Sequence, residues 1–162
     1  MRTKTRMLVL GTMLAMVGAA AAASAQNKMG SEYGEWELDV GHSTYRPGPA
    51  PKSSWRRYVY IENGYTFLSR GVDAQGKHVS TNFTVHFDGK YAPMTGSSDA
   101  DSIMVRRVDD RTVESTQKKG GKVVIHTQRV TSRDGTSMTS TSWGTNAAGK
   151  EYKNVEVFGR KK

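Results

Sequence analysis

The sequence has no cysteine, and beyond residue 25 it has almost no leucine. The lack of cysteine excludes both a disulfide framework and a thiol nucleophile. After residue 25 the chain contains two leucines and six alanines, against thirteen valines and thirteen threonines. Leucine and alanine favour helices, whereas β-branched side chains fit a pleated sheet. No long stretch repeats apolar residues at helical spacing. We therefore predict an all-β fold.

The one long apolar run lies at the start of the chain. Three basic residues within the first six positions precede Met7–Ala23, and Ala23-Ser24-Ala25 has the small-x-small pattern of a signal-peptidase site. We expect residues 1–25 to be a cleaved signal peptide and the mature protein to be periplasmic or extracellular. The alternative is an uncleaved anchor, for which a run of 17 residues is at the lower limit of length.

The remaining 137 residues carry a net charge of +6 and form one domain's worth of chain. Lys, Arg, Gln and Thr occupy the alternating positions where an outer-membrane barrel needs an apolar band, so we do not expect the mature chain to span a membrane. Residues 26–33 are predicted to be a flexible tail. Residues 34–162 are predicted to be a single β-barrel domain.

Turn signals recur about every ten to fourteen residues in this domain, often as Asp-Gly or Asn-Gly, which supply the positive φ of tight hairpins. Nine runs of strand-forming residues lie between or beside them: Trp36–Val40, Trp55–Glu62, Tyr65–Gly71, Val79–Phe87, Ile103–Val108, Thr112–Lys118, Lys122–Thr131, Ser137–Trp143 and Tyr152–Phe158. We predict an antiparallel up-and-down meander of about eight to ten strands, closed or nearly closed into a small barrel. The first strand should lie beside the last, because closure removes both exposed edges.

Two of these runs differ in how they alternate. Val79–Phe87 places its apolar residues on one face and polar residues on the other, as a half-buried antiparallel strand does. Trp55–Glu62 has apolar or aromatic residues on both faces. Between the first two runs, residues 41–54 hold three prolines, which we interpret as a long loop, either a lid over a barrel mouth or a plain crossover.

Gly34-Glu35-Trp36 opens the first predicted strand as the Gly-x-Trp motif opens the first strand of lipocalins. The chain resembles these calycin-like barrels in that motif, although it has no Thr-Asp-Tyr triplet. The resemblance implies that an arginine on a late strand covers Trp36, and either Arg129 or Arg160 fits.

Residues 34–158 are also similar to a group of small, secreted bacterial β proteins without an established activity. The shared segments are Trp36-x-Leu38 with Ser43-x-Tyr45, Pro47-Gly48-Pro49-Ala50-Pro51, Gly71–Lys77, Asp88–Tyr91 with Thr95-Gly96, and Lys119-Gly120-Gly121-Lys122. This resemblance implies a small β fold and no particular chemistry.

The residues that carry chemistry are few. The four histidines, His42, His78, His86 and His126, include no pair at metal-ligand spacing, and there is no Gly-x-Ser-x-Gly elbow. We therefore expect no enzyme activity, no bound metal and no cofactor.

Two binding functions remain. The first is a small apolar or amphipathic ligand held in the barrel. The second is an anionic component of the cell envelope bound by basic strands such as Trp55–Tyr60; an exported protein is not expected to meet nucleic acid. For the first, we predict an apolar pocket near the Pro47–Pro51 mouth, with Arg57 as the anchor for a carboxylate or phosphate. Its apolar walls are predicted to be Trp36, Trp55, Val59 and Phe83.

Overall fold

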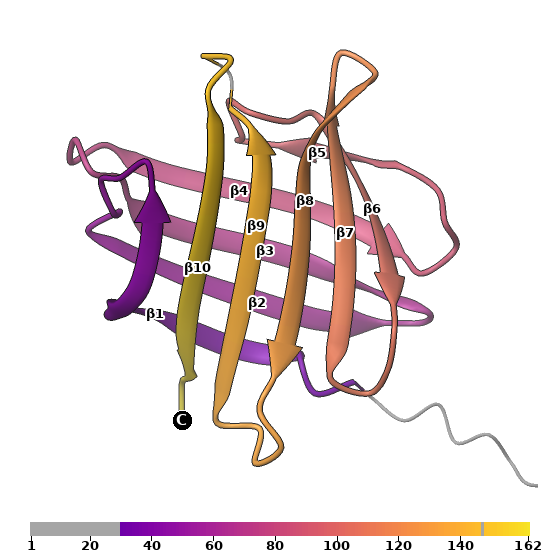
Figure 1. Ribbon diagram of the computed structural model, residues 1–162. Coiled ribbons are helices and arrows are strands. Elements are labelled where there is room, and N and C mark those ends of the chain that lie inside the picture. The colour runs from indigo at the N-terminus through magenta and orange to yellow at the C-terminus, as the bar shows by residue number, and fades with distance from the viewer. Residues whose placement is uncertain (1–29, 147) are drawn as a thin grey trace, which may run out of the picture.

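The computed structural model describes residues 30–146 and 148–162, which form a closed barrel of ten antiparallel strands (Figure 1). The strands are β1 (Gly34–Arg46), β2 (Ser53–Ile61), β3 (Gly64–Val72), β4 (His78–His86), β5 (Ala92–Thr95), β6 (Ser102–Arg107), β7 (Thr112–Lys119), β8 (Lys122–Thr131), β9 (Ser137–Thr145) and β10 (Glu151–Arg160). The predicted signal peptide and its cleavage site lie outside the described residues. The described residues contain no helix that is long and apolar enough to cross a membrane.

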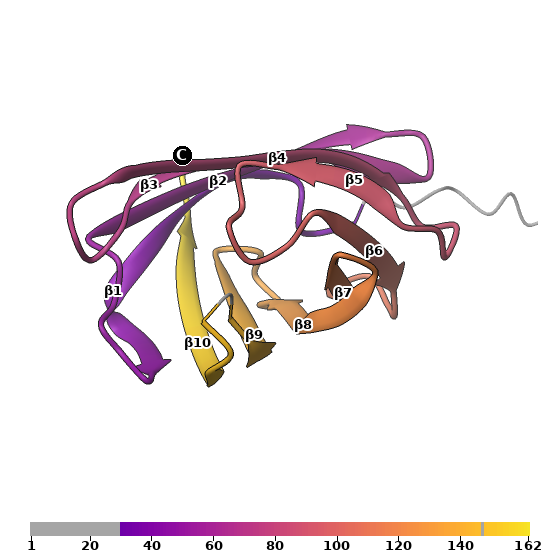
Figure 2. The ribbon, with the colours of Figure 1, turned by 90° about the horizontal axis from the view of Figure 1, so that it is seen from above.

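Each strand pairs with its neighbours in the chain, and β1 pairs with β10 to close the ring. This confirms the predicted up-and-down topology. The barrel is flattened: β2–β5 form one layer that crosses β6–β10 at a steep angle, and β1 bends between the two layers (Figures 1 and 2).

The first strand is longer than the sequence predicted. Instead of a loop over 41–54, β1 continues to Arg46, with a bulge between Asp39 and Thr44. The Ser43 hydroxyl stabilises the bulge, because it donates to the Asp39 carbonyl at 2.6 Å and accepts from the Val157 amide at 2.9 Å. A bulge interrupts the alternation of apolar and polar residues, so the sequence predicted that this strand ends at Val40.

One of the ten strands, β5, has no counterpart among the nine predicted runs. It has four residues, contains Pro93 and makes two residue pairs with each neighbouring strand. A strand this short shows no alternation, and its proline argues against a central strand.

The core lies inside the barrel and follows the alternation of the strands. In β4, Phe83 and Val85 are buried and Thr84 is exposed, as predicted, whereas Val79 at the strand's start is exposed. The fully enclosed apolar side chains come from both layers: Trp36, Tyr58, Tyr65, Val85, Ile103, Val105, Val113, Met138 and Phe158.

Residues 26–33 were predicted to be a flexible tail; residues 26–29 lie outside the described residues, and residues 30–33 pack against the end of the barrel. Glu32 is 2% exposed and forms an ion pair with Arg107. The Ser31 amide donates to the Asp110 carbonyl at 3.1 Å. The polar character of residues 30–33 suggested a tail, but Glu32 finds its partner in a strand 75 residues away, which local sequence does not indicate.

Gly144 in β9 lies where no side chain fits. A Cβ on this residue would stand 1.9 Å from the Val124 carbonyl oxygen. We expect Gly144→Ala to lower the free energy of unfolding by about 1–3 kcal/mol, as overpacking does. The matched control is Gly159→Ala in β10, whose Cβ would meet no atom within 4 Å. Equal urea midpoints for the two variants would contradict this prediction.

The β8–β9 turn is held by Asp134, which accepts from the Ser132 hydroxyl at 2.5 Å and the Thr136 amide at 3.0 Å. These bonds lower the pKa of Asp134 from 3.8 to about 2. Because the folded pKa is depressed, its stabilisation is present above pH 3.8 and is lost as pH falls through about 2. We expect the gap in urea midpoint between wild type and Asp134→Ala to be constant near neutral pH and to narrow below pH 3.8. A gap that does not change with pH would refute the role given to the carboxylate.

Candidate ligand site inside the barrel

One end of the barrel is closed around Trp36. Its side chain is fully buried, and its indole N–H donates to the Glu32 carbonyl at 2.8 Å. The Arg160 guanidinium lies 4.1 Å from the indole ring centre and donates to the Tyr33 and Ser31 carbonyls, each at 2.6 Å. Of the two arginines that the lipocalin resemblance left open, Arg160 therefore covers Trp36.

A cavity of about 190 Å³ lies inside the barrel, between the two layers. Its apolar wall includes Phe67, Phe83, Met94, Ile103 and Ile125, and its polar wall includes Arg56, Tyr58, Ser115, Thr127, Arg129, Tyr152 and Glu156. Apolar and polar side chains therefore line the same interior cavity.

A second hollow of about 290 Å³ lies at the other end of the barrel, beside the β9–β10 turn at the top of Figure 1. Pro47 and Pro49 line it, so the proline-rich segment lies at this mouth of the barrel. Ser142, Tyr152 and Glu156 line both hollows, so the mouth adjoins the interior cavity. The cavity alone is smaller than the roughly 300–1,000 Å³ of sites for drug-sized molecules, and a larger ligand would extend into the mouth.

The most unusual residue in the cavity wall is Arg129 in β8. It is 6% exposed, and its guanidinium donates to the Tyr65 hydroxyl at 2.5 Å and lies 5.0 Å from the Tyr58 ring centre. Among the described residues, no carboxylate forms an ion pair with it. Arginine cannot lose its proton in a protein, so a full positive charge stands in this wall. Burial raises the pKa of Tyr65 to about 12, so its hydroxyl stays protonated and does not neutralise the charge.

Polar atoms without hydrogen-bond partners line the same cavity. The Nε of Arg129, the Tyr58 hydroxyl and the Ser115 hydroxyl are buried, line the cavity and have no hydrogen-bond partner. A buried polar group left unpaired costs about 1–3 kcal/mol. The cavity therefore presents one cation and two hydroxyls that a bound molecule with acceptor atoms would satisfy.

The other cation in the cavity wall, Arg56 in β2, is partly buried and already neutralised. Its guanidinium lies 2.7 Å from a Glu156 carboxylate oxygen, and the Tyr45 hydroxyl donates to the other oxygen at 3.1 Å. Burial raises the pKa of Tyr45, so this hydroxyl keeps its proton. The pair cancels its own charge, and the net charge of the cavity wall is that of Arg129.

The predicted pocket is not assembled as expected. Phe83 lines the cavity, but Trp36 belongs to the closed end. Arg57 and Val59 lie on the outer face of β2, with 53% of the Arg57 side chain and 42% of Val59 exposed. Trp55 is also on the outer face, where its indole N–H donates to Glu35 at 3.2 Å. Trp55, Arg57 and Val59 therefore form no apolar pocket with Phe83.

The error concerns one face of one strand. The side chains of β2 that enter the barrel are those of Arg56 and Tyr58, which alternate with the predicted residues. Both faces of this strand carry an arginine and aromatic residues, so alternation does not say which face is inside. In β8 the alternation did indicate the inner face. Arg129 lies on the same face of the strand as Thr127 and Thr131, and all three are buried.

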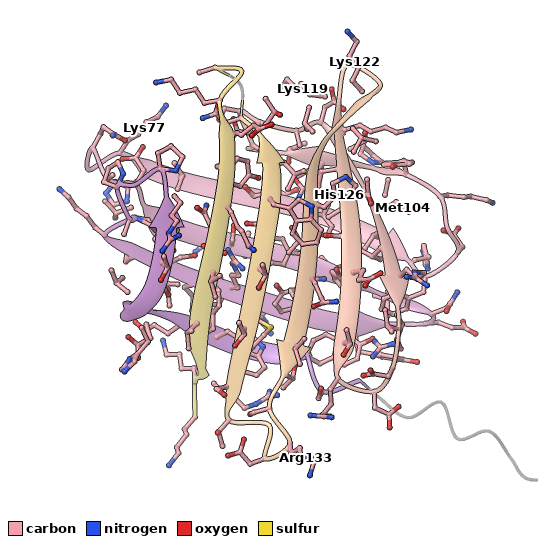
Figure 3. The ribbon with its side chains drawn as sticks, in the orientation of Figure 1. Lys77, Met104, Lys119, Lys122, His126 and Arg133 are labelled. Atoms are coloured by element: carbon pink, nitrogen blue, oxygen red, sulfur yellow. The ribbon has the colours of Figure 1, made fainter. Side chains whose placement is uncertain are left out.

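The same arrangement divides the expected basic surface. Arg56 points inward and Arg57 outward, so they do not form one patch. Lys122 projects from the β7–β8 turn and Arg133 from the β8–β9 turn, at opposite ends of the molecule (Figure 3). Binding to an anionic envelope component stays a prediction.

The histidines lie apart. His42 contacts Asp39, His86 contacts the Glu62 carbonyl, and His126 stacks on Trp143 with ring centres 5.7 Å apart. In the part of the chain that the structure describes, no group of three His, Cys, Asp or Glu side chains could hold a metal ion.

Neither a protein-family model nor a curated protein sequence matches this chain. Among solved structures, zebrafish ileal bile acid-binding protein in complex with cholic acid is similar, with 13% sequence identity and a TM-score of 0.49. The match covers 81% of this chain and 99% of that chain.

Proposed function

We propose that the barrel binds a small amphipathic anion, with its carboxylate or phosphate at Arg129 and its apolar part against Phe67, Phe83 and Ile125. The observation that carries this proposal is the buried Arg129 charge, for which no carboxylate of the described residues lies within ion-pair distance. A lone buried charge costs several kcal/mol, and a bound anion removes that cost.

The chemistry of the wall matches an amphipathic ligand. The Tyr58 and Ser115 hydroxyls have no partner and are available to an anionic oxygen. The stacked rings of Phe67 and Phe83, with centres 4.7 Å apart, offer an apolar surface in the same cavity. The predicted leader supports the further proposal that the protein does this outside the cytoplasm, and the ligand is reached through the mouth beside Pro47 and Pro49.

Octanoate, octanol and octylamine share a chain length and differ in charge, so they test this proposal. A ligand that binds only the folded state raises the unfolding temperature, and at equal concentration the tighter ligand raises it more. We expect octanoate to raise it most, octanol less and octylamine not at all, as measured by a thermal melt and by calorimetric titration. The octanoate effect should persist in high salt, because buried charges are weakly screened. Equal effects of the three compounds, or none, would rule out an anion site.

A further inference from the structure

Trp55 is held in place on the outer face of the barrel, yet its ring is uncovered. The indole N–H is fixed by the hydrogen bond to Glu35, and the side chain is partly exposed. The other two tryptophans have ring partners, Arg160 over Trp36 and His126 against Trp143. Among the described residues, no cation or aromatic ring lies on Trp55.

Opposite charges stand on either side of this ring. Glu37 in β1 and Arg70 in β3 are the direct cross-strand partners of Trp55 in β2. Neighbouring strands are about 4.8 Å apart, so the backbones of Glu37 and Arg70 lie about twice that spacing apart, with Trp55 between them. Within the described part of the chain, neither Glu37 nor Arg70 has an ion-pair partner.

The surface is hollowed beside these three residues. Glu37, Trp55 and Arg70 line both a groove of about 440 Å³ and an adjoining hollow of about 320 Å³. The groove adds the hydroxyls of Ser53, Ser54 and Ser80, and the smaller hollow adds Glu35 and Lys161. A molecule lying across Trp55 would thus meet an acid at one end and a base at the other.

We propose that this outer groove binds a zwitterion with a quaternary ammonium and a phosphate, the chemistry of a phosphocholine group. The ammonium lies over the Trp55 ring beside Glu37, since weakly hydrated quaternary cations are recognised by aromatic faces. The phosphate lies at Arg70, whose planar guanidinium suits phosphate geometry. Glu35 and Glu37 would repel a simple anion, and Arg70 and Lys161 would repel a simple cation, so a ligand that carries both charges fits better. This site is on the opposite side of the wall from the interior cavity and does not depend on the ligand proposed there.

Calorimetric titration with phosphocholine, choline and inorganic phosphate tests the proposal. We expect phosphocholine to bind more tightly than either part alone. Trp55→Ala should weaken it roughly fivefold, the upper range for a cation on an exposed ring. Trp143→Ala, which removes another exposed tryptophan, is the matched control and should bind as the wild type does. Unchanged binding in Trp55→Ala, or no binding by the wild type, would overturn the proposal.

A charge reversal keeps the test independent of any effect of Trp55→Ala on folding. Glu37 is exposed, so Glu37→Lys should fold, lose phosphocholine and gain affinity for inorganic phosphate. If Glu37→Lys binds phosphocholine as the wild type does, the proposal fails.

Vesicles distinguish a membrane from a free molecule as the source of this group. Co-sedimentation with phosphatidylcholine vesicles that is lost in Trp55→Ala would support the site and assign it to a lipid head group. Binding of glycerophosphocholine without vesicle binding would support the site and assign it to a soluble molecule. Vesicle binding that survives in both Trp55→Ala and Glu37→Lys would contradict the proposal.

Discussion

Arg129→Met is expected to remove the preference for octanoate over octanol without lowering the stability of the empty barrel. Methionine fills most of the volume of arginine and carries no charge, so the anion loses its partner. Truncating one side of a buried charge pair typically costs 2–5 kcal/mol of binding, and we expect octanoate to weaken by roughly that amount.

The stability part of this prediction follows from opposing costs. Losing the hydrogen bond from Arg129 leaves the Tyr65 hydroxyl without that partner, which costs about 1–3 kcal/mol. Removing an unpaired buried charge removes its desolvation penalty and so raises the free energy of unfolding by several kcal/mol. The unfolding free energy, measured in urea without ligand, should therefore stay level or rise. A loss of more than about 1 kcal/mol would show that Arg129 serves the fold rather than a ligand.

Arg56→Met is the matched control for this variant. It removes the other arginine that lines the same cavity, which is only partly buried, but here Glu156 loses its ion-pair partner at 2.7 Å. Removing one partner of a buried pair leaves an uncompensated charge, so this variant should be less stable than the wild type by a few kcal/mol. The expected result is a loss of unfolding free energy in Arg56→Met and no loss in Arg129→Met.

Trp36→Ala should lower the free energy of unfolding more than any of the other substitutions proposed above. The side chain is fully buried at the closed end, and its removal leaves a cavity beneath Arg160 and frees the Glu32 carbonyl. We expect the unfolding free energy to fall by about 3–5 kcal/mol in a urea titration.

Trp143→Ala provides the comparison, because Trp143 is 43% exposed and contacts His126 on the outer face. Its effect should stay within about 1 kcal/mol. If the two tryptophan variants unfold at the same urea concentration, Trp36 does not hold the closed end together.

The architecture could be predicted because its signals are local and repeated. Valine and threonine enrichment, the alternation in Val79–Phe87 and the regular turns each favour short antiparallel strands. The bulge in β1 and the four residues of β5 interrupt that regularity, and there the predicted boundaries differed from the structure.

The candidate site was predicted less well than the fold, because the prediction depended on which face of β2 points into the barrel. Arg56 and Arg57 are adjacent, and each has aromatic neighbours on its own face of β2. The face is decided by pairing with β1 and β3, which places Tyr58 beside Phe67 in the interior. An arginine anchor for an acidic head group was expected, but the sequence pointed to Arg57, and the candidate in the structure is Arg129.

The pairing of β1 with β10 has a consequence for how the chain folds. Every other pair of strands in the ring is adjacent in sequence and can form as a local hairpin, whereas this one joins Trp36 to Arg160. Until it forms, the open meander has two complementary free edges, and unpaired edges are templates for another chain. At high concentration during refolding, β1 of one molecule would meet β10 of a second, and the product would be a domain-swapped dimer that keeps every native strand pair.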